Sequence, residues 1–122
     1  MPIRVLLCDD VEPFRALVRA QLAEDPAIEV VGEAGDGDEG VERATDLQPD
    51  VVLLDLTMPG CDGLTAIPRL RRFAPRASIV ALSALEARLM AEDVLGRGAS
   101  KYLEKGADAA AIRAAIHEAY AG

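Results

Sequence analysis

The sequence predicts an α/β fold, a (βα)5 sandwich in which helices cover both faces of a doubly wound, five-stranded parallel sheet. Short β-type runs alternate five times with longer segments whose apolar residues recur at helical spacing. The runs 5–7 and 51–54 are apolar without alternation, which is typical of strands buried on both faces. The chain has 122 residues, of which 51% are hydrophobic, so we expect one domain over residues 1–122.

Five strands are predicted, and a helical pattern follows each of them. The strand candidates are, in chain order, Ile3–Cys8, Ile28–Glu33, Val51–Asp55, Ser78–Ser83 and Lys101–Glu104. The apolar residues at helical spacing are Phe14, Leu17, Val18 and Leu22, then Val41 and Ala44, then Leu64, Ile67 and Leu70, then Leu89, Val94 and Leu95, and finally Ile112, Ala115, Ile116 and Ala119.

Proline and glycine mark the ends of these segments. Prolines precede three of the strands, and Gly96 and Gly98 end the fourth helical pattern. Pro68 falls inside the third pattern, where it removes a backbone donor. We therefore expect a kink in that helix, or a helix that starts late.

Composition and charge exclude several classes of function. The 13 Lys and Arg residues against 21 Asp and Glu residues give a net charge of −8, which argues against direct nucleic-acid binding. The two cysteines do not suggest a disulfide framework or a cysteine zinc site. No membrane span or signal peptide is visible in the sequence. We expect a cytoplasmic protein that does not bind membranes.

Polar residues follow four of the predicted strands. They are Asp9 and Asp10 after the first, Asp55 at the end of the third, Ser83 at the end of the fourth and Lys105 after the fifth. A sheet of order 2-1-3-4-5 places the first and third strands side by side, and ligands bind at the carboxyl ends of such strands. Three carboxylates in one pocket repel one another, and bound Mg2+ would explain them because it takes oxygen ligands.

The chain resembles the receiver domain of bacterial response regulators over residues 1 to 122. The resemblance rests on Asp9-Asp10, on Asp55 in the segment Leu53-Leu54-Asp55-Leu56-Thr57-Met58-Pro59-Gly60 followed by Asp62-Gly63, on Ser83-Ala84, and on Tyr102-Leu103-Glu104-Lys105. It implies the CheY-like, flavodoxin-like fold. The segment Leu103-Glu104-Lys105-Gly106-Ala107 is more similar to the receivers of LuxR-type transcription factors.

The resemblance also implies a role for each site residue. Asp55 is the implied phosphoacceptor, and Asp10, Asp55 and the backbone carbonyl of Thr57 would coordinate Mg2+, while Asp9 would help through water. Ser83 and Lys105 would hold the phosphoryl oxygens. Ser83 and Tyr102 would be the switch residues, with Tyr102 the aromatic that swings inward on activation. The family usually has Thr at the position of Ser83, which keeps the hydroxyl donor.

The implied function is a switch in a two-component system. A histidine kinase or phosphotransfer protein would supply the phosphoryl group, and a surface around the fourth helix, fifth strand and fifth helix would signal the result. The output stays open. For the LuxR-type subfamily it would be transcription, through a C-terminal DNA-binding domain outside this chain. Homodimer formation on phosphorylation also stays open.

Two alternatives also stay open. A small Mg2+-dependent phosphatase with an aspartate nucleophile is one, although haloacid-dehalogenase-like enzymes expect a second Asp where Thr57 stands. The other is a pseudo-receiver that only binds partners. Each acidic residue alone is more simply a helix cap or a turn residue, and Lys105 alone a solvated charge. The combination at successive strand ends favours the phosphorylation site.

Overall fold

The computed structural model describes residues 2–56, 63–83 and 87–122, with the backbone alone for 87–90. Within these residues, five strands alternate with five helices, as the sequence predicts. The strands are β1 (Ile3–Cys8), β2 (Ile28–Ala34), β3 (Val51–Asp55), β4 (Ser78–Ser83) and β5 (Lys101–Glu104). The helices are α1 (Glu12–Ala23), α2 (Gly37–Leu47), α3 (Gly63–Phe73), α4 (Ala87–Gly96) and α5 (Ala109–Ala121).

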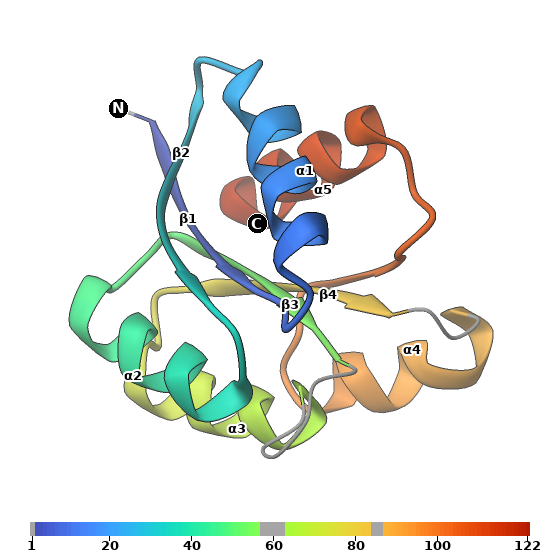
Figure 1. The fold of residues 1–122 in the computed structure, drawn as a ribbon. Coiled ribbons are helices and arrows are strands. Elements are labelled where there is room, and N and C mark those ends of the chain that lie inside the picture. Colours follow the sequence, from blue (N-terminus) through green and yellow to red (C-terminus); the bar gives the residue numbers. More distant parts are fainter. Residues whose placement is uncertain (1, 57–62, 84–86) are drawn as a thin grey trace.

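The strands form one parallel sheet in the order β2-β1-β3-β4-β5, which confirms the predicted topology. Helices α1 and α5 cover one face, and α2, α3 and α4 cover the other (Figure 1). The chain therefore builds three layers, with the sheet in the middle.

Each face of the sheet has its own apolar core, because alternate strand residues point to opposite sides. In β1, Val5 and Leu7 pack toward α1 and α5, whereas Leu6 and Cys8 pack toward α2, α3 and α4. All four side chains are at most 2% exposed. This explains why the central strands are apolar without alternation.

The register of the central strands sets the position of the polar residues. Cys8 of β1 is opposite Leu54 of β3, so the next residue of each chain segment, Asp9 or Asp55, emerges at the same edge. In the neighbouring pair, Ser83 of β4 is opposite Glu104 of β5. The carboxyl ends of these four strands therefore meet beside one another.

Two glycines permit backbone geometry that other residues would resist. A Cβ on Gly63 would lie 2.5 Å from Leu56 Cα and 2.6 Å from the Asp55 carbonyl oxygen, so α3 can begin this close to the end of β3 only with glycine. Gly98 has a φ of 121°, and it follows the end of α4. The predicted stop of the fourth helix is confirmed.

Pro68 lies in the interior of α3, and the helix does not start late, since it begins at Gly63. A residue with an N–H at position 68 would donate to the carbonyl of Leu64, and proline cannot. The Leu64 carbonyl instead accepts a long hydrogen bond of 3.5 Å from Arg97 Nη1. None of the helices in the described part of the chain is long and apolar enough to cross a membrane.

Candidate functional site

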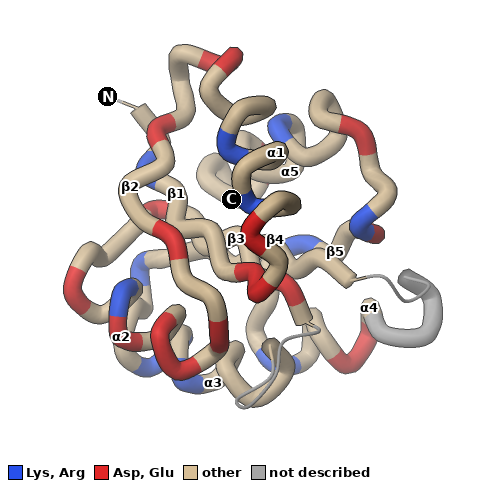
Figure 2. The backbone as a smooth tube through the Cα atoms, in the orientation of Figure 1, with Lys and Arg blue, Asp and Glu red and all other residues tan. Residues whose placement is uncertain are grey.

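Three carboxylates meet at the carboxyl edge of the sheet. Asp9 follows β1 and is 4% exposed, Asp55 ends β3 and is 1% exposed, and Asp10 is exposed. One ligand oxygen from each of the three lies within 4.8 Å of the others. Figure 2 shows this gathering of acidic residues where β1 and β3 end. The structure thus confirms the predicted juxtaposition.

Lys105 supplies the positive charge of this site. Its backbone N–H donates to the Ser83 carbonyl at 2.8 Å, which extends the β4–β5 ladder by one residue and orients the side chain. Its Nζ donates to Asp55 Oδ2 at 3.0 Å and lies 3.1 Å from Asp9 Oδ2. Partial burial alone would lower the pKa of Lys105, but the two carboxylates outweigh burial and raise it.

One oxygen of Asp9 is held locally, and the other is not. Asp9 Oδ1 accepts a hydrogen bond of 2.8 Å from the Val11 N–H at the start of α1. Oδ2 is buried, and among the described residues its polar partner is Lys105 Nζ, at 3.1 Å. A buried carboxylate oxygen held by a single ion pair fits a cation ligand, because burial of a charge is costly unless the charge is well paired.

The donor set suits Mg2+. This ion binds to one or two carboxylates and keeps several waters, and the exposed Asp10 leaves one side of the cluster open to solvent. The local charge of three carboxylates and one ammonium is −2, which a divalent cation would neutralise. The residues present therefore fit the metal that the sequence predicts.

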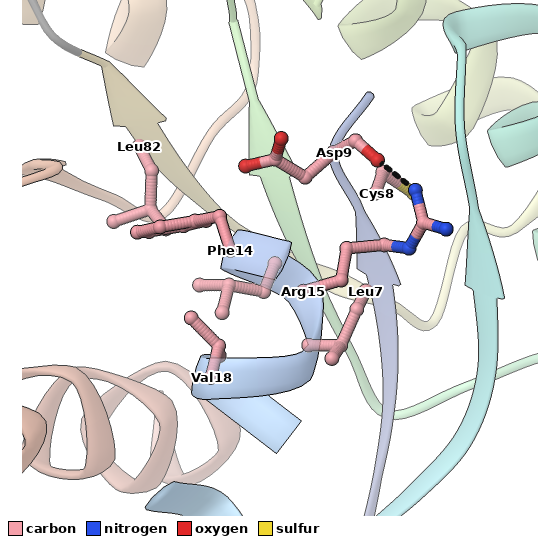
Figure 3. A pocket seen from close by; sticks show the side chains of 8 residues that line it. Leu7, Cys8, Asp9, Phe14, Arg15, Val18 and Leu82 are labelled. Atoms are coloured by element: carbon pink, nitrogen blue, oxygen red, sulfur yellow. Dashed lines mark hydrogen bonds between the residues drawn. The ribbon is translucent and has the colours of Figure 1, made fainter. Parts of the chain in front are cut away.

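Two neighbours of the site come from α1, and the sequence patterns did not single them out. The Phe14 ring lies under Lys105, with its centroid 4.7 Å from Nζ, at a cation–π distance. Arg15 donates through Nη1 to the Asp9 carbonyl. Both line a small cavity of about 10 Å3 beside the acidic site (Figure 3). In the sequence, Phe14 is indistinguishable from a core residue and Arg15 from a surface charge.

The other predicted site residues fall in different places. Ser83 is fully buried at the end of β4, next to the carboxylate edge. Tyr102 is half-buried in β5 and packs against the core layer beneath α2, α3 and α4. Thr57, whose carbonyl is a predicted metal ligand, lies outside the described residues.

The strand order and the carboxylate–lysine site define a class of doubly wound α/β domains that bind ligands where strand order reverses. Residues 5–117 match the family model described as "response regulator receiver domain". The transcriptional regulatory protein LiaR of Bacillus subtilis (strain 168) is 43% identical over 120 residues, which are 98% of this chain and 57% of LiaR.

Solved structures agree with this match. The signal receiver domain of the response regulator NarL from Mycobacterium tuberculosis superposes with a TM-score of 0.94 at 31% identity and covers 99% of this chain and 98% of that one. CheY in the CheX–CheY–BeF3–Mg2+ complex from Borrelia burgdorferi superposes with a TM-score of 0.86 at 28% identity. The match covers 97% of this chain and 89% of that one.

The chain belongs to the response regulator receiver domain family of two-component signalling systems. It spans little more than half the length of the first curated relatives that it matches. The relatives include transcription regulators, and others are protein-glutamate methylesterases. The predicted family and fold are therefore confirmed.

Proposed function

We propose that Asp55 of this receiver accepts a phosphoryl group and that the acidic site around it holds Mg2+. The observation that carries the proposal is the position of Lys105 Nζ, 3.0 Å from Asp55 and 3.1 Å from Asp9. An ammonium between two buried carboxylates stands where it can neutralise a phosphoryl oxygen that arrives at Asp55. Lysine suits this place because it is a compact point charge.

Each residue of the site has a part in the transfer. A carboxylate oxygen of Asp55 forms the new bond to phosphorus, while the bond from phosphorus to the imidazole nitrogen of the donor's phosphohistidine breaks and that nitrogen keeps the electron pair. Lys105 and the Ser83 hydroxyl bind phosphoryl oxygens. Asp9, Asp10, Asp55 and the Thr57 carbonyl would hold Mg2+, which neutralises charge on the transferring group.

In this proposal, partners recognise the phosphorylated state at a surface distinct from the acidic site. Phosphorylation shifts a two-state equilibrium of the face formed by α4, β5 and α5, with Tyr102 as the switch residue. The partners are a histidine kinase or phosphotransfer protein in the cytoplasm and a C-terminal DNA-binding output domain. A transcriptional output is in keeping with the similarity to LiaR, a transcriptional regulatory protein. The domain acts as a switch that assists its own phosphorylation and dephosphorylation, rather than as a turnover enzyme.

Intact mass spectrometry after incubation with a small phosphodonor and Mg2+ tests the acceptor. We expect one added phosphoryl group on the parent and none on Asp55→Asn. Asp46→Asn, which removes an exposed carboxylate of α2, is the matched control and should be labelled like the parent. Labelling of Asp55→Asn at the parental rate would place the acceptor elsewhere. Continuous hydrolysis of phosphate monoesters would instead indicate the phosphatase.

The two lysines of the chain allow a paired test of Lys105. Lys101 carries the same charge, lies at the start of β5 and forms an exposed ion pair with Glu118 at 3.1 Å, whereas the carboxylates gather at the opposite ends of the strands. We expect Lys105→Ala to reduce the conformational response to phosphorylation at least tenfold and Lys101→Ala to leave it within about twofold. Equal losses would remove Lys105 from the phosphoryl site.

A further inference from the structure

Arg15 connects three parts of the fold from the first turns of α1. Its side chain is only 18% exposed, which is low for arginine. Nη1 donates to the backbone carbonyl of Asp9, and Figure 3 shows this bond beside the cavity. Nε donates to Glu33 Oε1 on β2 at 3.1 Å. One guanidinium thus joins α1, the end of β1 and the edge strand of the sheet.

Glu33 is shared by two arginines of α1. Its Oε2 accepts from Arg19 Nη1, while Oε1 accepts from Arg15. Burial alone would raise the pKa of Glu33, but the hydrogen bonds from Arg19 and Arg15 lower it. Glu33 is therefore a fixed negative charge that orients the Arg15 guanidinium. Arg19 touches Glu33 without touching Asp9, so it is a natural control.

The carbonyl that Arg15 binds belongs to the peptide unit between Asp9 and Asp10. On the other side of Asp9, its N–H donates to the Ala34 carbonyl at 3.0 Å. Asp9 therefore has a hydrogen bond at each of its two peptide groups. The second of these peptide groups also contains the backbone nitrogen of Asp10, so its orientation affects that residue too. Without Arg15, the second of these peptide groups would lose its side-chain partner.

We propose that Arg15 is a positioning residue for the divalent cation and that Glu33 acts through it. The Arg15 bond fixes the peptide between the two acidic residues, so that both carboxylates face the cation site before the ion arrives. This inference rests on the proposed function, because it takes Asp9 and Asp10 as metal ligands. Pre-organised ligands lose less conformational freedom on binding.

The direction in which Mg2+ affinity changes when Arg15 is replaced distinguishes a positioning role from a purely electrostatic one. A positive guanidinium near the site repels Mg2+, so loss of the charge alone would tighten metal binding. Loss of a positioning contact would weaken it. Outer contacts of metal ligands typically change affinity by about 10- to 100-fold when removed.

The test is a Mg2+ titration without phosphodonor, followed by amide NMR shifts, on the full 122-residue chain. We expect Arg15→Met, which keeps the apolar stem, to weaken Mg2+ binding about tenfold, and Glu33→Gln to weaken it severalfold. Arg19→Met should stay within about twofold. Phosphorylation of Arg15→Met should recover to near the parental rate at saturating Mg2+.

Distinct results overturn distinct claims. Equal or tighter Mg2+ binding by Arg15→Met, or the same loss in Arg19→Met, refutes the positioning role. If Arg15→Met fails to fold, Glu33→Gln decides the question, because unchanged Mg2+ binding by that variant also refutes the role. The metal site and the proposed function fail if the parent does not bind Mg2+, or if Asp10→Asn binds it as well as the parent does. The positioning role of Arg15 fails with them.

Discussion

Removal of one carboxylate should stabilise this domain in the absence of metal. Asp10 is the clearest residue to change, because Lys105 pairs with Asp9 and Asp55 and, within the described residues, Asp10 has no ion pair of its own. Asp10→Asn therefore removes repulsion between carboxylates and breaks no ion pair of the described residues. The side chain is exposed, so the substitution creates no cavity and no buried unsatisfied group.

The separation of the carboxylates sets the size of the effect. At 4.8 Å, the largest separation of the clustered oxygens, two unit charges repel by about 3.5 kcal/mol at an effective dielectric constant of 20. Lys105 offsets part of this repulsion, and solvent around Asp10 screens most of the rest. We expect Asp10→Asn to raise the free energy of unfolding by about 1 kcal/mol in chelator.

Urea melts with chelator and with Mg2+ measure both halves of the prediction. A ligand that binds only the folded state stabilises it by about 2.7 kcal/mol at 100 times its Kd, so the parent should gain and Asp10→Asn should lose most of that gain. Glu29→Gln, at the far end of β2, is the control for general charge reduction. The reasoning is refuted if Asp10→Asn is less stable than the parent in chelator and gains as much from Mg2+.

Three further predictions address groups around the site. Burial raises the pKa of Cys8 to about 12 from 9.0. In a Cys61→Ser variant, which keeps Cys8 as its one thiol, the folded protein should therefore resist thiol reagents at pH 8, and rapid labelling would contradict this. The free energy of unfolding should fall as pH rises above 9, where only the unfolded thiol loses its proton. Phe14→Leu should lower the pKa of Lys105, measured by side-chain NMR, and slow phosphorylation about two- to fivefold, since a cation–π contact contributes about 0.5–1 kcal/mol; an unchanged pKa would deny the ring a role. Leu85 lies outside the described residues, and the family resemblance implies that its position flanks the path of the attacking water. An apolar side chain cannot orient water, so Leu85→Glu should shorten the lifetime of the phosphorylated state, and equal decay curves would refute this.

The position of Lys105 along the chain follows from local sequence, whereas its side-chain contacts follow from the tertiary fold. Its place after β5 follows from the sequence pattern, and its backbone bond to Ser83 follows from the parallel ladder. Its side-chain partners are Asp55 at the end of β3 and Asp9 after β1, which lie far from it along the chain. No local preference encodes such contacts, which depend on the order of the strands.

The strands, the helices and the set of polar residues at the strand ends could all be predicted from the sequence, because period, apolar content and Gly or Pro punctuation are local properties. The motifs that carry the family resemblance are likewise short and local. The part that α1 plays at the site became visible only in three dimensions, with the Phe14 ring beneath Lys105 and the Arg15 guanidinium on the Asp9 carbonyl. These roles depend on where α1 packs across the sheet, and helical spacing alone does not distinguish a site neighbour from a core or surface residue.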